Sequence, residues 1–541
     1  MNQQKGTYKI FFNLAYHLKM LIFFLLIFMS HCLSSAWAAN VYIDPNYSGE
    51  ESGTFSQPYN SWNDVIPLSS STDYRQKCGT QFSQSTTLSL SAKGTANDYV
   101  IIGAYYNNAG TPVHEDDNPS FGENCGNGVA KPIIINTNGN VSDTLRVTGD
   151  YVEVNSIQAL EGINSIRPNG DHMRIVYNQA IGGKSGIRCG QVSSTDNIYI
   201  GYNYLYTDLG SAPSLPGILI YNMENAIVEY NYIDGFSLSG IITWYNSDNN
   251  IIRYNKIYSW DQHMDHCMQT QGHNNKYLHN YCHESGIFHI SRGSGSEIAY
   301  NIVDGLSNNP YYGSTKGVFN TNPVYSEEGI TNFKIHNNVV YDRGGHPDVA
   351  WKGINIYIGS DHQVPVKGMQ YYNNVFVNLQ GDQFGNTQSP ISVIDNCNMV
   401  ESNPSNPEVN TFHNNIFYGQ KDSRYAIIEG VTYYSADTFN RDYGAAYNNR
   451  NADPGLKDPS KGEFWPASVL STVVGNGYDG GEHSDKLLSP STTVWGEKTS
   501  APLVQLTTQP TSWTIGAYAF GVADTPRLRA PRNVFTMDIK R

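Results

Sequence analysis

The chain has 541 residues, of which only 15% are charged, whereas 12% are aromatic and 50 are glycine. So many large side chains are not typical of disordered chains, and so many turn-forming residues are not typical of helical bundles. The net charge of −14 argues against a general binder of nucleic acid or anionic membranes, because its long-range field repels polyanions. We therefore expect an extracellular β-rich protein, in which an anionic substrate would need a local basic patch or a bridging cation.

Residues 1–39 have the pattern of a Sec-type signal peptide. Three lysines precede an apolar run from Leu21 to Met29, and Ala36 and Ala38 supply the small residues of a cleavage site. The run is shorter than the roughly 20 residues of a spanning helix, although a retained N-terminal anchor is the alternative. We expect a secreted or periplasmic protein without a later transmembrane span.

Six cysteines follow this segment. Cys78 and Cys125 are candidates for a disulfide that closes an N-terminal loop in an oxidising compartment. For the other four, disulfides and free buried thiols remain equally open. No Cys-x-x-Cys pair occurs, so a structural zinc site is poorly supported.

From residue 151 onward the chain repeats an asparagine flanked by aromatic or apolar residues, with another apolar residue two positions later. The first copies lie about 25 residues apart, which is the period of a solenoid coil. The copies centre on Asn155, Asn203, Asn231, Asn255, Asn280, Asn301, Asn337, Asn373 and Asn414, with Asn178 a weaker early member.

Each repeat also contains short alternating patterns, such as Ile198 to Ile200, which predict strands with one buried face. Several strands per coil without helical periods exclude leucine-rich and helical repeats, and predict an all-β parallel β-helix. Coils of such a solenoid stack about 4.8 Å apart, so the side-chain amides of successive asparagines can bond to one another. We expect this asparagine ladder to be structural.

A second column supports the same register. In seven coils a glycine followed by Ile or Val begins a strand, whereas the coil between Gly240 and Gly286 has His266 and Cys267 there. Local rules are most often broken at functional or strained sites. We therefore predict that His266 replaces the column glycine for function. The glycines are Gly162, Gly186, Gly217, Gly240, Gly286, Gly317 and Gly353.

Both ends of the repeat region carry distinctive phrases. Val41–Gly49 and Ser61-Trp62 open it, and Asn451-Ala-Asp-Pro454 and Ile515-Gly-Ala-Tyr518 close it. With the repeat, these phrases make the chain resemble the secreted right-handed parallel β-helix proteins, which include polysaccharide lyases, uronan epimerases and pectin-type hydrolases. The resemblance covers roughly residues 41–520 and implies a right-handed solenoid, but the sharper catalytic motifs of its branches are absent, so no specific activity is implied.

We accordingly divide the chain into four parts. Residues 1–39 are the signal peptide, 40–140 an N-terminal cap with the first coils, 141–420 the regular β-helix, and 421–541 a less regular closing region.

Histidines gather around the broken glycine column. Counted by column, Asp265 is a vertical neighbour of Lys316 and Lys352, and Met264 is a neighbour of Glu284. His289 follows Ile287 by two positions, so we expect it to point into the coil interior. His263 and His266 lie with Asp265 on a long polar turn, where a catalytic role and ordinary turn chemistry are both open. The six clustered histidines are His263, His266, His273, His279, His283 and His289.

A metal ion is a further possibility for this region. Two histidines with a carboxylate could hold a transition metal, and Asp261, Asp265 and Glu284 could hold Ca²⁺, which also bridges uronate carboxylates. No fixed-spacing motif supports either, so the metal requirement stays open.

Aromatic residues offer a sugar-binding surface. Tyr221 and Trp244 stand four residues after their column glycines, where we expect them to point outward, and Tyr312 lies on a turn near Lys316. Flat exposed rings suit the faces of sugars, and Lys352 could add a charge. The alternative is an outward apolar stripe under a terminal segment, made of Leu219, Ile242, Met268, Phe288 and Phe319.

The leading hypothesis is an exported enzyme that acts by β-elimination or C5 epimerisation on a uronate-containing polysaccharide. Such chemistry needs a base for the C5 proton and a cation for the uronate carboxylate. His266 or His263 would be the base, and Arg292, Lys316 or bound Ca²⁺ would neutralise the charge.

Two other hypotheses remain. A glycoside hydrolase would use Asp265 and Glu284 as its carboxylate pair, since adjacent coils bring them to a suitable separation. A surface carbohydrate-binding or structural β-helix would have no catalysis. In each case the expected partner is a polysaccharide rather than nucleic acid, and the expected state is a monomer.

Overall fold

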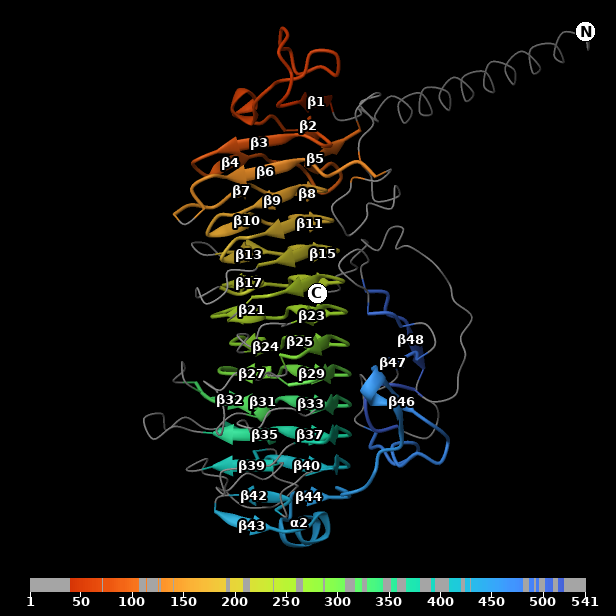
Figure 1. Cartoon of the computed structure of the whole chain (residues 1–541). Coiled ribbons are helices and arrows are strands. Elements are labelled where there is room, and N and C mark those ends of the chain that lie inside the picture. Colours follow the sequence, from red (N-terminus) through yellow and green to blue (C-terminus); the bar gives the residue numbers. More distant parts are fainter. Residues whose placement is uncertain are drawn as a thin grey trace, which may run out of the picture.

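The computed structural model shows a tall stack of coils with a separate segment packed along one side (Figure 1). It describes residues 39–519 with gaps, so all of the predicted signal peptide except Ala39 lies outside the described residues. The longer gaps are 107–112, 114–124, 208–214, 259–265, 307–316, 344–351, 358–365, 380–390, 395–407, 480–485 and 496–501.

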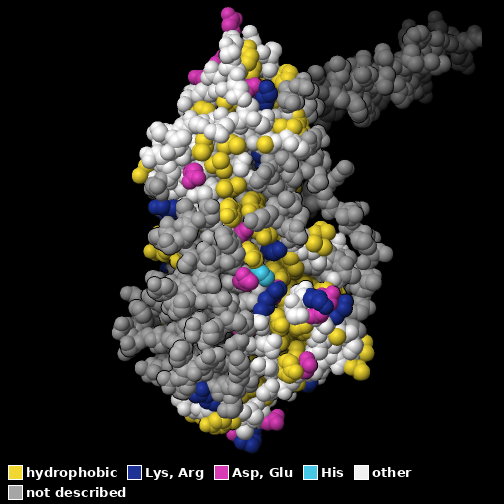
Figure 2. Space-filling model, in the orientation of Figure 1, with side chains coloured by type: hydrophobic (Ala, Val, Ile, Leu, Met, Phe, Trp, Pro, Cys, Tyr) yellow, Lys and Arg dark blue, Asp and Glu magenta, His cyan; other side chains and the backbone are white. Residues whose placement is uncertain are grey.

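Three sheets run the length of the stack, and every neighbouring pair of strands in them is parallel except the last pair of the second sheet. Each coil contributes one strand to each sheet in turn, so strands that pair come from successive coils. This topology confirms the predicted all-β parallel β-helix. Apolar side chains run along the stack in Figure 2, with acidic, basic and histidine side chains interspersed.

The first sheet begins each described coil of the repeat. Its strands, in order, are β1 (Ala39–Ile43), β2 (Thr72–Lys77), β5 (Val100–Tyr105), β8 (Val152–Asn155), β11 (Arg174–Val176), β15 (Tyr199–Gly201), β19 (Ile227–Glu229), β22 (Ile251–Arg253), β25 (Lys276–Leu278), β29 (Glu297–Ala299), β33 (Lys334–His336), β37 (Gln370–Tyr372), β40 (Thr411–His413) and β44 (Ala446–Tyr447).

The third sheet follows the first after a tight turn. Its strands are β3 (Gln81–Gln84), β6 (Ile133–Asn136), β9 (Gln158–Leu160), β12 (Gln179–Ile181), β16 (Tyr204–Tyr206), β20 (Tyr232–Asp234), β23 (Lys256–Tyr258), β26 (Tyr281–His283), β30 (Ile302–Asp304), β34 (Val339–Tyr341), β38 (Val375–Val377) and β41 (Ile416–Tyr418).

The second sheet completes each coil and carries the candidate site. Its strands are β4 (Leu88–Ser91), β7 (Leu145–Thr148), β10 (Asn164–Asn169), β13 (Ser185–Cys189), β17 (Ile218–Tyr221), β21 (Ser239–Trp244), β24 (His266–Thr270), β27 (Phe288–Ile290), β31 (Gly317–Thr321), β35 (Lys352–Tyr357), β39 (Ile391–Ile394), β42 (Ala426–Ile428) and β43 (Val431–Tyr433).

Short elements close the two ends and edge the stack. The 3-10 helix η1 (Trp62–Val65) buries Trp62, whose Nε1 donates to Gln76 Oε1 at 2.7 Å near the first coil. Helix α2 (Ala436–Asp442) closes the other end, where Phe439 is fully buried. Small edge sheets join β14 (Thr195–Asp196) to β18 (Met223–Glu224), and β28 (Gly293–Ser294) to β32 (Ile330–Thr331) and β36 (Val366–Lys367).

The closing segment turns back along the outer face of the third sheet (Figure 1). Phe464, Leu487 and Tyr518 are buried in one cluster with Ile302 and Val339 of that face. Among the described residues, no helix has the length and apolar character that crossing a membrane requires. The segment contains β45 (Leu456–Asp458), η4 (Pro459–Lys461), β46 (Glu463–Pro466), β47 (Lys486–Leu488) and β48 (Leu506–Thr508).

The asparagine ladder is confirmed between the first and third sheets. Each side chain donates from Nδ2 to Oδ1 of the asparagine in the next coil, at 3.0 Å from Asn231 to Asn255 and from Asn255 to Asn280. These side chains are fully buried, so each bond replaces water that the amide has lost. The ladder runs through Asn178, Asn203, Asn231, Asn255, Asn280, Asn301, Asn338, Asn374, Asn415 and Asn449.

Four predicted ladder members were wrong. Asn155 lies two positions before the ladder site, where its Nδ2 donates to Glu153 Oε1 instead. Asn337, Asn373 and Asn414 each precede the true ladder residue and have positive φ of 53° to 55°. In most earlier coils this left-handed position is held by tyrosine. Asparagine tolerates that conformation well, which explains why Asn-Asn pairs appear in the later coils.

Four of the described cysteines form two disulfides. The predicted Cys78–Cys125 disulfide is confirmed, and Cys267 and Cys282 form a second one. Cys189 is a free, buried thiol, and Cys397 lies outside the described residues.

One lysine lies wholly inside the protein. Lys131, just before β6, is fully buried, and its Nζ donates to the backbone oxygen of Tyr177 at 2.5 Å. Burial lowers the pKa of this lysine from about 10.5 to about 7. The folded protein therefore disfavours the protonated, charged form of this amine relative to the unfolded chain.

The ladder generates a stability prediction. Asn255→Ala removes the acceptor for both the backbone N and Nδ2 of Asn231. We expect the free energy of unfolding to fall by about 1 to 3 kcal/mol, because buried donors lose their partner. The denaturant midpoint measures this, with the exposed Asn63→Ala as the control. Equal midpoints for the two variants would contradict a stabilising ladder.

Lys131 generates a pH prediction. Between about pH 7 and about pH 10.5 the unfolded chain holds one more proton at this lysine than the folded chain, so this group's contribution to stability rises with pH across that window. Lys131→Met should therefore be most stabilising relative to the parent near pH 6, and progressively less so toward pH 9. Thermal unfolding at both pH values measures the difference, and a pH-independent difference would contradict the buried charge.

Candidate functional site

The outer face of the second sheet carries a polar column in its middle coils. Gln269 of β24, His289 of β27, Asn320 of β31 and Asn355 of β35 lie opposite one another in successive coils. Their strand neighbours Met268, Phe288 and Phe319 belong to the buried core. Since side chains alternate along a strand, the polar column points away from the coil interior.

His266 and His289 are two titratable groups in direct contact on this face. Nε2 of His266 lies 2.9 Å from Nδ1 of His289, and the ring planes meet edge to face at 83°. The residues are 6% and 8% exposed, respectively. At this distance one nitrogen donates and the other accepts, so the pair contains at least one neutral ring nitrogen with its lone pair.

Neighbouring amides and hydroxyls extend the pair into a polar patch. Gln269 Nε2 donates to Ser291 Oγ at 3.3 Å, and Asn355 Nδ2 donates to Asn320 Oδ1 at 2.8 Å. These side chains are buried, and their hydrogen bonds connect successive coils. The patch therefore combines acid–base groups with neutral hydrogen-bonding groups.

His266 is not level with Gly240, which corrects the sequence analysis, although counted through β27 it is level with Gly317 two coils further on. It lies opposite Ser239, whose Oγ donates to the backbone oxygen of His266 at 3.1 Å. Cys267 lies opposite Gly240, where an added Cβ would come within 2.5 Å of Ile257. Ile257 in turn lies opposite Cys282 in the next coil, so the disulfide occupies the crowded inner corner.

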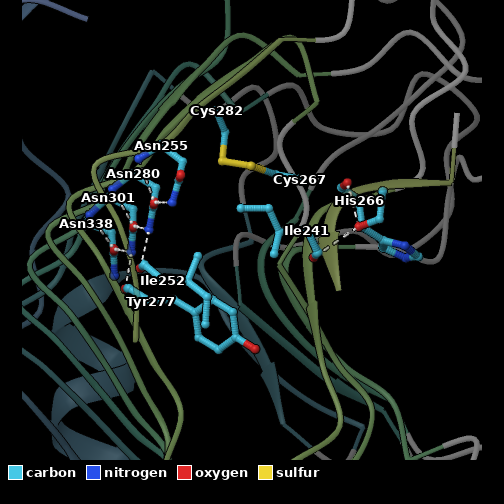
Figure 3. Close-up of a disulfide and its surroundings, with 11 residues drawn as sticks. Ile241, Ile252, Asn255, His266, Cys267, Tyr277, Asn280, Cys282, Asn301 and Asn338 are labelled. Atoms are coloured by element: carbon cyan, nitrogen blue, oxygen red, sulfur yellow. Dashed lines mark hydrogen bonds between the residues drawn. A yellow bond between two sulfur atoms is a disulfide. The ribbon is translucent and has the colours of Figure 1, made fainter. Parts of the chain in front are cut away.

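Figure 3 shows the consequence for His266. The Cys267–Cys282 bridge lies in the coil interior facing the asparagine ladder, whereas the side chain of His266 points away from it. The irregular coil thus has a structural explanation in Cys267, and His266 reaches the outer face because it directly precedes that anchored residue.

His289 was wrongly expected to point inward. Both Phe288 and Ile290 belong to the core, and the residue between them must face outward. The alternation Phe-His-Ile in the sequence carried this signal, but counting from Ile287 shifted the strand by one position and reversed its faces.

Tyr221 and Trp244 are vertical neighbours, as expected. They lie opposite each other in β17 and β21 with ring centroids 6.5 Å apart, and Tyr245 adds a ring that is 46% exposed. The alternative prediction was an outward apolar stripe of five residues. It is wrong for Met268, Phe288 and Phe319, which point inward, whereas Leu219 and Ile242 lie outside the main core cluster.

Several candidate residues lie outside the described part of the chain, namely His263, Asp265, Tyr312 and Lys316. Lys352 begins β35 and lies opposite Gly317, one position away from the predicted column. The sequence analysis aligned Lys352 with Asp265 and Lys316, one position before the column glycines, and that alignment is wrong by one residue because Lys352 is level with Gly317 itself.

Glu284 belongs to a different surface, at the end of β26 in the third sheet. Its Oε1 lies 3.7 Å from Nε2 of His283, whose Nδ1 is 3.3 Å from the fully buried Asp304. Asp304 also accepts hydrogen bonds from Tyr281 and, at 2.6 and 2.7 Å, from Arg343. Burial opposes the charge, but bonds from His283, Arg343 and Tyr281 hold the pKa of Asp304 below its usual value.

Arg292 is held by an ion pair at the corner after β27. Its Nη2 lies 3.0 Å from Oε2 of Glu328, which also approaches His273 at 3.7 Å. A uronate carboxylate would have to compete with Glu328 for this guanidinium. In the described part of the chain, no three His, Cys, Asp or Glu side chains come together as metal ligands.

No family model and no curated protein matches the chain. Solved structures similar to it include the PL6 family alginate lyase AlyGC, at 13% identity and TM-score 0.43, covering 80% of this chain and 59% of that one. A GH136 lacto-N-biosidase from Eubacterium ramulus matches at 15% identity and TM-score 0.37, covering 59% and 67%. An alginate lyase from Paenibacillus sp. matches at 13% identity and TM-score 0.30, covering 76% and 98%.

Proposed function

We propose that this protein is an exported enzyme that moves the C5 proton of a uronate residue in a polysaccharide, by β-elimination or by epimerisation. The observation that carries the proposal is the contact between His266 and His289 on the outer face of the second sheet. Export is supported by the N-terminal leader, and mass analysis of the mature N-terminus tests it.

The pair supplies what both reactions require. A neutral imidazole takes the C5 proton, and the electron pair of that C–H bond is delocalised toward the uronate carboxylate. In elimination the C4–O bond then breaks, a C4–C5 double bond forms, and the leaving oxygen takes up a proton. In epimerisation a proton returns to C5 from the opposite face. The second histidine can supply or relay that proton.

Strand composition favours this chemistry over hydrolysis. Strands β17, β21, β24, β27, β31 and β35 contain no Asp or Glu, whereas glycoside hydrolysis ordinarily uses two carboxylates across the scissile bond. Within the described residues, Glu284 stands with His283 on the third sheet rather than beside the histidine pair. Asn and Gln amides around the pair suit sugar hydroxyls.

The proposal predicts the effect of removing one imidazole. His289→Ala should lower turnover of a uronate polymer by about 10²-fold or more, the usual scale of acid–base catalysis, while a cooperative thermal transition shows that the variant is still folded. Ultraviolet absorbance detects the double bond of elimination, reducing ends detect chain cleavage, and proton exchange at C5 detects epimerisation.

His273→Ala is the matched control, because His273 is a partly exposed histidine at a different edge of the coil. Loss of activity in both variants would point to a general effect of histidine removal. Full activity in His289→Ala would place catalysis elsewhere, and binding of polymer by the parent without any of the three signals would indicate a binding protein.

A further inference from the structure

Three arginines stack in successive coils above the histidine pair on the same outer face. Arg146 of β7 lies opposite Arg167 of β10. Arg188 of β13 continues the column, because Ile166 and Ile187, the residues just before Arg167 and Arg188, also lie opposite each other. Ile187 and Cys189 are buried in the core, so Arg188 between them points outward. We call these three residues the arginine column.

One carboxylate serves two members of the column. Asp143 accepts from Arg146 at 2.7 and 3.1 Å and lies 3.2 Å from Arg167 Nη1. It also accepts from Asn164 at 2.6 Å. Burial opposes its charge, but bonds from Asn164 and Arg146 hold the pKa of Asp143 below its usual value. Asp143 therefore bridges Arg146 and Arg167.

Arg188 has no such partner. It forms no ion pair with any residue that the structure describes, and its buried Nε makes no hydrogen bond there. Burial, followed by repulsion from Arg167, lowers the pKa of Arg188, and the attraction of Asp143 offsets only part of this effect. Like charges directly opposite each other destabilise a sheet, so the column is strained electrostatically. An anion between Arg167 and Arg188 would relieve that repulsion.

Aromatic rings continue from the column toward the histidines. Tyr221 lies two positions after Leu219, the residue opposite Arg188, and Trp244 lies opposite Tyr221 in the next coil. The outward positions from Arg188 through Leu219, Ile242 and Gln269 reach His289 in four coil steps, or about 19 Å at roughly 4.8 Å per coil. This spacing is longer than one sugar ring.

We infer that the arginine column is a binding subsite for the anionic groups of a saccharide polymer, several sugar units away from the histidine pair. The identity of the ligand as a saccharide rests on the proposed function. Guanidinium groups bind carboxylates or sulfate esters through paired hydrogen bonds, and the half-buried Tyr221 and Trp244 offer ring faces to the intervening sugars.

The experiment measures polymer binding with catalysis removed. In a His289→Ala background, affinity electrophoresis compares polygalacturonate, dextran sulfate and neutral dextran. Arg188→Gln should weaken binding of an anionic polymer about tenfold, whereas Arg188→Lys, which keeps the charge, should lose less. The matched control is Arg441→Gln, an exposed arginine on α2 that pairs with Asp442. Polygalacturonate and dextran sulfate distinguish carboxylate from sulfate as the bound group.

A second variant covers the case in which Arg188→Gln fails to fold. The Arg146 side chain is 40% exposed, so Arg146→Gln should fold and weaken anionic binding in the same direction. The inference is overturned if Arg188→Gln binds the anionic polymer as tightly as the Arg441→Gln control does; where Arg188→Gln does not fold, Arg146→Gln takes its place in this comparison. It is also overturned if neutral dextran binds as tightly as the anionic polymers, or if neither anionic polymer binds.

The two proposals can fail separately. Arginine-dependent binding of a polymer that the parent protein never cleaves or epimerises supports the subsite and refutes the proposed reaction. Turnover that depends on His289 but is unchanged in Arg188→Gln, on long and short substrates alike, supports the reaction and refutes the subsite.

Discussion

The structure depends on the hydrogen-bonded stacking of one coil on the next. The asparagines of the ladder connect neighbouring coils: Nδ2 of Asn255 donates to the backbone oxygen of Val228 in the preceding coil, to that of Arg253 in its own coil, and to Oδ1 of Asn280 in the next coil. Because these amides are fully buried, an insertion at the ladder turn would leave several donors without acceptors. Changes in coil length are accommodated elsewhere, so the remaining turns can vary.

Because the coils stack, residues that are one coil apart in the sequence become direct neighbours in space. His266 and His289 are separated by one coil and meet at 2.9 Å, while the polar residues from Gln269 to Asn355 form a line across four strands. The Cys267–Cys282 disulfide anchors β24 to β26 across the interior, directly beside His266. The site is therefore built on strands whose positions the core fixes.

Different segments and side chains lie on the outer faces of the second and third sheets. The third sheet is covered by the closing segment, which buries Tyr281 and Tyr518 in one cluster and leaves the Asp304 network at its edge. The second sheet carries the histidine pair, the aromatic rings and the arginine column. This difference separates Glu284 from the histidine pair and places the histidine pair and the arginine column on one sheet.

The sequence by itself determined the solenoid, because the repeated asparagine and the alternating apolar residues follow from coil stacking and strand geometry. It also indicated the Cys78–Cys125 disulfide and the neighbouring Tyr221 and Trp244. Only the tertiary structure decided strand register, since a shift of one residue reverses inside and outside. In the structure His289 points outward rather than inward, and His266 lies opposite Ser239 rather than Gly240. The ladder contains Asn338 rather than the expected Asn337. Contacts between coils, rather than local composition, fix such choices.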